Sequence, residues 1–419
     1  MFSAPTGKRA KREIALYALG GASTTPPAFS GSQRTKKSYR RRVWLTLGGK
    51  EEKVGNLKKK FLDLVAQKKK ALAPHEGFVG IRADGALKGT NGDIDGELVP
   101  LSSSSGSGGE EGFFFIPAAP LRALEGEALE ITPQAQVVVV RGGNITLTLG
   151  VFGDEYPPLV LPPRPGEEEE GFGVEVPMEG DFLRSFAEAM RTVVPMAAQE
   201  GASRPLFQGV QVECGGAFRV VATDGYRLGL KDLGNLQVPR AREFSLILPR
   251  KWVPALAGLL EEGKRGTLYP NGTGVGVVLE GDSWIARLYV RAIPGKLPPY
   301  EGLIPQGPWG SIARFGAEEA LRVLEKLSPL SDEGRVRVSL TPERLKFEVA
   351  GPYGGGEAII QARTEGTESS FSFHLEHLSD ALRGARGEVE MKFLPESPSP
   401  SPVLIESEGY KALIVPLKE

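Results

Sequence analysis

Residues 221–230, VATDGYRLGL, place an aspartate and an arginine three residues apart, beside a threonine and a tyrosine. Asp224, beside Arg227, could act in acid–base catalysis only with a second titratable group near it. The surroundings would have to give the two groups different pKa values. No other stretch of the sequence presents a comparable cluster of carboxylates or histidines. A structural interpretation accounts for the same residues. A strand ends at Thr223, Asp224 accepts hydrogen bonds from the following backbone amides, Gly225 permits the reversal, and a strand resumes with Tyr226.

Two further motifs fail as ligand sites. NGDIDG at 91–96 fits the first six positions of a calcium loop, but Ser102 stands where the bidentate glutamate belongs. We predict a polar hairpin there. GTGVGV at 272–277 has no following helix and no Lys-Ser/Thr pair, so it is not expected to bind phosphate.

Histidine and cysteine give no stronger signal. His374 and His377 would share a helix face, but no third metal ligand is near them in the sequence. Cys214 precedes a Gly-Gly turn without a local His or Asp to activate it, which predicts a small buried residue. The sequence therefore predicts no catalytic residue, no metal site and no cofactor.

The length, charge and cysteine count say more about the cellular compartment of the protein than about its binding partners. The chain has 419 residues, with 51 Lys and Arg against 52 Asp and Glu, so a net charge of -1 favours neither a nucleic-acid binder nor an acidic protein. One cysteine excludes internal disulfides and fits a reducing compartment. No apolar run approaches membrane-spanning length, and the start lacks a secretory signal. We expect a cytoplasmic protein without membrane contact.

Residues 1–40 differ from the rest in charge. They hold eight lysines and arginines against one acid, Glu13, among Gly, Ser, Thr and Pro, which predicts a basic and largely disordered arm. Two interpretations stay open: a solubilising tail or mis-assigned start, and an arm that contacts DNA phosphates.

The remaining sequence repeats one plan three times. Each repeat is expected to run strand, helix, several strands, helix, several strands, which is an antiparallel α+β unit. Pro-rich segments at 152–162 and 295–305 close the first two repeats and are followed by linkers. The predicted domains are 41–165, 168–305 and 306–419.

Cations gather on the first helix of each repeat. The segments are 57–72, 181–194 and 317–327. Six lysines around the first helix exceed what solvation requires and favour a surface that faces phosphates. For the third helix a solvated face explains the charges equally well. The candidate DNA-facing residues are Lys58, Lys59, Lys60, Lys68, Lys69, Lys70, Arg184, Arg191, Arg322 and Lys326.

Four segments resemble the bacterial DNA sliding clamp, the beta subunit of DNA polymerase III. They are RPLFQGVQVECGGAFRVVATDGYRLGL (204–230), LILPRKWVPALAGLL (246–260), RAIPGKLPPYEGLIP (291–305) and GYKALIVPLKE (409–419). The resemblance extends over residues 170–419. In the first domain it rests on the repeat plan, and the first forty residues have no counterpart.

The resemblance implies a non-catalytic processivity factor. Three similar domains per chain and a head-to-tail homodimer would form a closed ring, with helices inside and sheets outside. The ring would encircle double-stranded DNA without reading its sequence, as phosphate contacts allow. Its implied partners are the alpha subunit of DNA polymerase III, the clamp loader and other proteins with clamp-binding motifs, and its implied location is the nucleoid.

The resemblance also implies a pocket for client peptides between the second and third domains. Tyr226 and Arg227 would supply its polar edges. For Val253 and Ile414 an ordinary core position is the stronger interpretation. Carried over position by position, the pocket comprises Phe207, Thr223, Gly225, Tyr226, Arg227, Leu228, Pro249, Val253, Leu297, His374, His377, Leu413, Ile414, Val415, Pro416 and Leu417.

Departures from the family keep alternatives open. Tyr226 stands where the family often has histidine, and Pro205 and Leu206 replace aromatic residues that contact DNA. The first domain carries the insert SSSSGSGGEEG at 102–112. A paralogue borne by a plasmid or phage, a clamp-like interaction module that no longer encircles DNA, and an enzyme using Asp224 and Arg227 are the competing hypotheses.

Overall fold

The computed structural model describes residues 43–46, 53–66, 74–101, 112–234 and 243–418. Short gaps fall at 83, 125–127, 135, 153–155, 168–170, 173, 332, 353 and 396–400. The basic arm at 1–40, most of the insert at 102–112, and Lys68, Lys69 and Lys70 lie outside the described residues.

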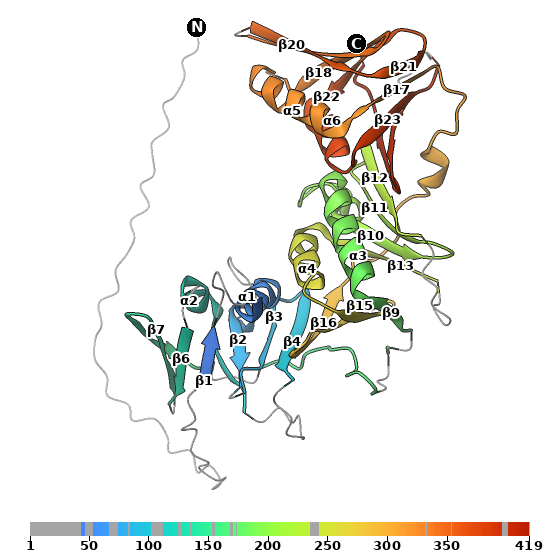
Figure 1. Cartoon of the computed structure of the whole chain (residues 1–419). Helices are drawn as coiled ribbons and strands as arrows, with labels where there is room; N and C mark the ends of the chain where they lie inside the picture. Colours follow the sequence, from blue (N-terminus) through green and yellow to red (C-terminus); the bar gives the residue numbers. More distant parts are fainter. Residues whose placement is uncertain are drawn as a thin grey trace, which may run out of the picture. The chain divides into compact units, whose positions relative to one another are not determined.

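The order of elements recurs three times along the chain, with one additional short strand, β21, in the third set (Figure 1). The first set is β1 (Val43–Thr46), α1 (Lys53–Val65), β2 (Phe78–Ile81), β3 (Leu87–Thr90), β4 (Ile94–Pro100), β5 (Phe114–Pro117), α2 (Ala118–Ala123), β6 (Ala128–Pro133), β7 (Val137–Gly142) and β8 (Ile145–Gly150). The second is β9 (Val176–Glu179), α3 (Gly180–Val193), β10 (Gly209–Cys214), β11 (Phe218–Thr223), β12 (Arg227–Asp232), β13 (Phe244–Pro249), α4 (Val253–Leu260), β14 (Arg265–Pro270), β15 (Gly274–Glu280) and β16 (Trp284–Arg291). The third is β17 (Ser311–Gly316), α5 (Ala317–Leu327), β18 (Arg335–Thr341), β19 (Arg344–Gly351), β20 (Gly354–Gln361), β21 (Arg363–Gly366), β22 (Ser369–His374), α6 (Leu375–Arg383), β23 (Glu388–Phe393), β24 (Val403–Ser407) and β25 (Tyr410–Ile414).

The described strands form four sheets, and every hydrogen-bonded strand pair named in them is antiparallel. Two sheets have four strands, β1-β6-β7-β8 and β20-β19-β18-β22. The other two run across repeats, in the orders β5-β2-β3-β4-β16-β15-β14-β9 and β13-β10-β11-β12-β25-β24-β23-β17-β21. The predicted antiparallel α+β class is confirmed.

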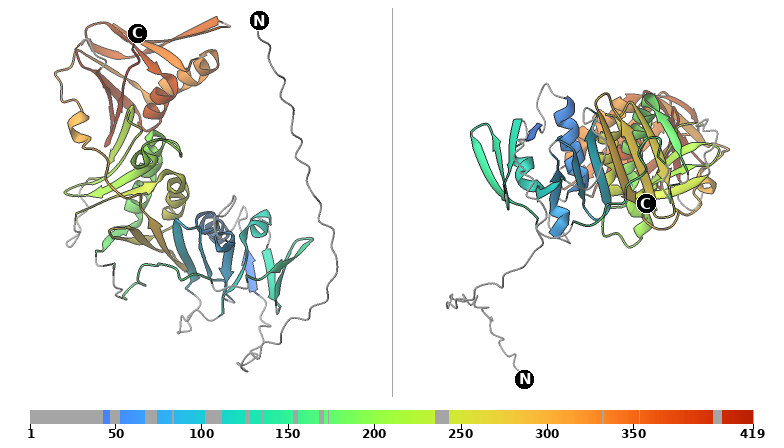
Figure 2. Two further views of the ribbon diagram at one scale, coloured as in Figure 1. Left: turned by 180° about the vertical axis from the view of Figure 1, so that it is seen from behind. Right: turned by 90° about the horizontal axis from the view of Figure 1, so that it is seen from below.

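Two strand pairs join the repeats. Strand β4 pairs with β16 from Ile94 opposite Val290 to Pro100 opposite Trp284. Strand β12 pairs with β25 from Arg227 opposite Ile414 to Lys231 opposite Tyr410. Figures 1 and 2 show β4 and β16 side by side within one sheet. Because backbone hydrogen bonds cross each joint, the sheet continues from one repeat into the next.

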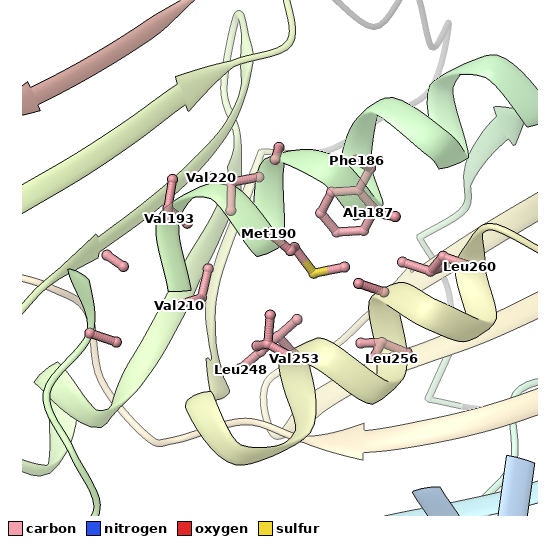
Figure 3. Close-up of a cluster of buried hydrophobic side chains, with 14 of the residues drawn as sticks. Phe186, Ala187, Met190, Val193, Val210, Val220, Leu248, Val253, Leu256 and Leu260 are labelled. Carbon is pink, nitrogen blue, oxygen red and sulfur yellow. The ribbon is translucent and has the colours of Figure 1, made fainter. Parts of the chain in front are cut away.

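Helices α3 and α4 supply the core of the second repeat. Phe186, Met190 and Val193 recur at helical spacing and are buried, so they form the inward face of α3. Figure 3 shows the Met190 side chain between the two helices, with Leu256 and Leu260 of α4 close by. Phe218 of β11 lies beneath, edge-on to Phe182 and Phe186. Phe182, at the same helical spacing, is half-buried against this core.

Two local predictions need adjustment. The first helix was expected at 57–72, but α1 begins at Lys53 and ends at Val65. Only Lys58, Lys59 and Lys60 of the six candidate lysines therefore lie on it as described. Cys214 was expected to be buried, but it is half-buried beside the Gly215-Gly216 turn, where burial raises the pKa of its thiol.

Among the described helices, none is long and apolar enough to cross a membrane.

Candidate functional site

The TDGYRL segment is a tight turn between β11 and β12. Strand β11 ends at Thr223, whose Oγ1 accepts a hydrogen bond from the Gly225 amide at 3.0 Å. The Asp224 Oδ1 accepts hydrogen bonds from the amides of Tyr226 at 2.9 Å and Arg227 at 3.0 Å. Gly225 has φ 96°, which favours glycine. The predicted strand end is confirmed, but the next strand starts at Arg227, and Tyr226 belongs to the turn with 69% of its surface exposed.

Arg227 lies inside the protein rather than at a pocket edge. Its Nε donates to Asp224 Oδ2 at 2.9 Å, its Nη1 to Asp380 Oδ2 at 2.7 Å, and its Nη2 to the Pro195 carbonyl at 3.0 Å. The side chain is 8% exposed. Each guanidinium nitrogen is engaged, so the expectation of a polar edge at Arg227 is corrected. The ion pair with Asp380 of α6 fastens the second repeat to the third.

A second apolar cluster lies on the sheet face opposite the helices. Val221 belongs to it, whereas Val220 and Ala222 belong to the main core, as alternation along a strand requires. Four predicted pocket residues meet in this cluster. Its buried members are Phe207, Val221, Leu228, Leu230, Ile247, Leu297, Tyr300, Leu404 and Leu413.

An exposed rim borders this apolar cluster. The Val415 amide donates to the Tyr226 carbonyl at 3.1 Å, which continues the β12–β25 pairing by one more residue. Tyr226 and Val415 are exposed, and Leu206 is half-buried against the cluster. An apolar floor with exposed side chains at its edge is an arrangement suited to docking a short peptide.

Other predicted pocket residues lie elsewhere. Val253 and Ile414 are 0% and 1% exposed in the main core, as the alternative interpretation held. Pro249 is half-buried at the end of β13, and Pro416 is buried. The Leu417 amide donates to the Ser372 carbonyl at 2.7 Å, so the chain after β25 runs on to β22.

The two histidines form a ring pair at the start of α6. The centroids of His374 and His377 are 4.5 Å apart. Burial, and then the charge of Arg227, lower the pKa of His377. His374 also lines a cavity of about 420 Å³ between the end of α5 and the start of α6, with Glu325, Ser379 and Arg383. His374 therefore faces this cavity as well as its neighbouring ring.

The candidate DNA-facing cations occupy helix surfaces, but several are paired with acids. Arg191 of α3 pairs with Glu261, and Lys60 of α1 pairs with Glu262. Arg184 pairs with Asp181 within α3. Lys58 and Lys59 are half-buried on α1. Arg322 and Lys326 are exposed on α5 and form no ion pair with the residues that the structure describes.

The NGDIDG segment makes the predicted hairpin, but its two aspartates and the following Glu97 form ion pairs at the joint between the first two repeats. The Asn91 Oδ1 accepts the amides of Asp93 at 2.9 Å and Ile94 at 2.8 Å. Asp93 pairs with Lys251 at 2.7 Å, Asp95 with Arg291 at 2.9 Å, and Glu97 with Arg287 at 2.5 Å. The sequence could not reveal these pairs because their members lie more than a hundred residues apart. In the described part of the chain no group of three or more His, Cys, Asp or Glu is placed to hold a metal ion.

Comparisons with known proteins give consistent results. No protein-family profile matches the sequence. The chain is 27% identical over 288 residues to the beta sliding clamp of Bacillus subtilis, covering 65% of this chain and 70% of the relative. It is 27% identical over 347 residues to that of Pseudomonas aeruginosa, covering 77% of this chain and 85% of the relative. The solved DNA polymerase III beta subunit of Thermotoga maritima superposes with a TM-score of 0.71 at 19% identity, covering 90% of this chain and 99% of that one.

The comparisons agree with the resemblance read from the sequence. The curated relatives of this chain are named beta sliding clamps, and the fold of the chain is that of the DNA polymerase III beta subunit. The resemblance and the fold class are confirmed.

Proposed function

We propose that this chain, a relative of the bacterial beta sliding clamps with their fold, is itself a non-catalytic DNA sliding clamp. Two copies joined head to tail would close a ring around duplex DNA. The ring would tether the alpha subunit of DNA polymerase III and other clients through the apolar cluster beside Tyr226. Such a tether raises the effective concentration of a polymerase at its template without any new chemistry.

The observation that carries this proposal is a third joint with no partner in the described chain. Strands β4, β12 and β20 occupy equivalent places in the three repeats, and so do β8, β16 and β25. Strand β4 pairs with β16, and β12 pairs with β25. Strands β20 and β8 are left as sheet edges. Since open edges tend to pair with another chain, β20 of one copy is the natural partner of β8 of the next.

Exposed apolar residues and strand register support this pairing. Ile145 on β8 and Ile359 on β20 are 44% and 52% exposed. At the two joints within the chain, Trp284, the first residue of β16, faces the seventh residue of β4, and Tyr410, the first of β25, faces the fifth of β12. Transferred to the edges, these registers place Ile145 opposite Ile360 or Ala358. Both partners, like Leu147 and Leu149 of β8, contact the helix-side core.

The charge distribution suits a polyanion held without sequence readout. Exposed Arg184, Arg191, Arg322 and Lys326, together with Lys58, Lys59 and Lys60, lie on the first helices of the three repeats. Side chains that meet phosphates alone give mobile binding that does not depend on sequence. We assign these first helices to the DNA side of domains 41–165, 168–305 and 306–419.

The client pocket is assigned to the apolar cluster and its rim. Phe207, Leu228, Leu297 and Leu413 form the floor, and Tyr226 and Val415 border it. A Cβ atom added to Gly225 would lie 3.2 Å from the Phe207 ring, so a larger residue would crowd this side chain of the pocket floor. A short motif with apolar side chains from the polymerase, the clamp loader or a repair factor would dock here.

Cysteine cross-linking tests the third joint. In a Cys214→Ser background, Ala358→Cys is combined with Ile145→Cys for one register or Leu147→Cys for the other. Antiparallel partners have Cα atoms about 4.5–5.5 Å apart, which permits a disulfide. One combination should give a covalent dimer under non-reducing denaturation. A ladder of larger species would indicate an open filament, and monomer alone with both combinations would favour an interaction module that does not encircle DNA.

A further inference from the structure

Two candidate DNA-facing cations converge on one glycine. A Cβ atom added to Gly258 of α4 would lie 3.8 Å from Arg191 Nη2 and 4.0 Å from both Cδ and Cε of Lys60. Arg191 comes from α3 and Lys60 from α1, so both side chains reach the same point on α4 from different helices. The missing side chain at Gly258 leaves the space in which they lie.

Two neighbouring acids hold these cations. Arg191 donates to both carboxylate oxygens of Glu261, through Nη2 to Oε2 at 2.9 Å and through Nη1 to Oε1. Lys60 donates to Oε1 of Glu262. Glu261 and Glu262 follow directly after Leu260, the last residue of α4. The pairing with Arg191 also lowers the pKa of Glu261, so this acid stays charged at neutral pH.

We propose that Lys60 and Arg191 form a two-cation site for a duplex phosphate above Gly258, and that Glu261 and Glu262 restrain it by competing with the phosphate. The inference rests on the proposed function, because the first helices must face DNA for a phosphate to arrive there. The acids would weaken each DNA contact and so favour sliding over tight binding.

The exposure of both pairs supports exchange with a ligand. The Arg191 and Glu261 side chains are 40% and 36% exposed, and those of Lys60 and Glu262 are 35% and 28% exposed. Ion pairs at such positions stabilise a fold little, so breaking one to admit a phosphate costs little. The buried Arg227–Asp380 pair, at 8% exposure on both sides, offers no comparable exchange.

The test uses the full chain and a short fluorescent duplex, with anisotropy measured over a series of salt concentrations. Glu261→Gln and Glu262→Gln are each compared with Asp282→Asn. The control removes one negative charge from an exposed ion pair, in which Asp282, between β15 and β16, contacts Lys264, just before β14. Each released cation that meets a phosphate should steepen the salt dependence by about 0.9 in the slope of log K against log salt. Binding at low salt should tighten several-fold.

Second substitutions decide whether the gain comes through the named cations. The gain of Glu261→Gln should vanish in an Arg191→Gln background, and that of Glu262→Gln in a Lys60→Gln background. A gain no larger than that of Asp282→Asn, or one that survives these backgrounds, would overturn the inference.

Retention of the wild-type protein on circular DNA distinguishes a failure of the phosphate-site hypothesis from a failure of the ring hypothesis. Retained wild type with unchanged Gln variants would sink the phosphate site alone. Tighter Gln variants combined with a wild type that is never retained would leave the phosphate site standing and sink the ring.

Discussion

Arg227 on β12 donates through Nη1 to Oδ2 of Asp380 on α6 at 2.7 Å, and both side chains are 8% exposed. The two residues are 153 positions apart and belong to different repeats. Their ion pair adds to the β12–β25 backbone pairing across the same joint. Leu228 and Leu413 of the candidate pocket lie on β12 and β25, so this part of the pocket floor lies at a joint that a buried ion pair stabilises.

Removing Asp380 should destabilise the protein strongly. Asp380→Ala leaves Asp224 as the acidic partner of the buried Arg227, and breaking a buried pair costs up to about 3–5 kcal/mol. Urea unfolding followed by circular dichroism measures the loss. Glu188→Gln is the matched control, because the Arg386–Glu188 pair is 75% and 50% exposed and should contribute at most about 1 kcal/mol. Equal losses in the two variants would contradict the assigned role of Asp380.

Tyr226 should separate peptide binding from stability. Its side chain is exposed in the turn, so Tyr226→Ala is expected to change the unfolding free energy by less than about 0.5 kcal/mol. A peptide carrying the clamp-binding motif of a polymerase alpha subunit should bind at least several-fold more weakly, since rim contact with the apolar cluster is lost. Isothermal titration calorimetry measures both affinity and stoichiometry. Unchanged affinity would place the peptide elsewhere.

Met190 tests the packing between α3 and α4 shown in Figure 3. Met190 is 0% exposed, and Met190→Ala should cost about 2–5 kcal/mol through the cavity that it leaves. Met190→Leu keeps the volume and should cost less than about 1.5 kcal/mol. Chemical denaturation compares the two. Similar losses for Ala and Leu would mean that the helix contact adapts to the change.

His377 should make stability depend on pH. Burial and the charge of Arg227 lower its pKa in the folded state, so between that value and the ordinary pKa near 6.5 the unfolded chain binds more protons. Stability is therefore fully present above about pH 6.5 and falls as the pH drops toward the folded pKa. His377→Gln should narrow the difference in urea midpoint between neutral and mildly acidic buffer. A difference as large as that of the wild type would exclude His377 as a source.

Local sequence patterns predicted much of the fold but few of the contacts between repeats. The repeated order of strands and helices and the reversal at Asp224 and Gly225 could be predicted, because both depend on residues that are neighbours in the sequence. The burial of Arg227 could not be predicted, since its partner Asp380 lies in another repeat. The same limit hid the pairs that Asp93 and Asp95 form with Lys251 and Arg291.

A ring that encircles DNA is held on it by topology, and one retention measurement tests this. The protein is mixed with linear duplex so that a closed ring can thread over an end, the DNA is circularised by ligase, and the mixture is passed over a sizing column at about 0.5 M salt, where exposed charge contacts are screened. The protein should elute with the circles and leave them once a nuclease cuts the DNA. Loss from intact circles, or equal retention on circular and linear DNA, would show that the protein does not encircle DNA.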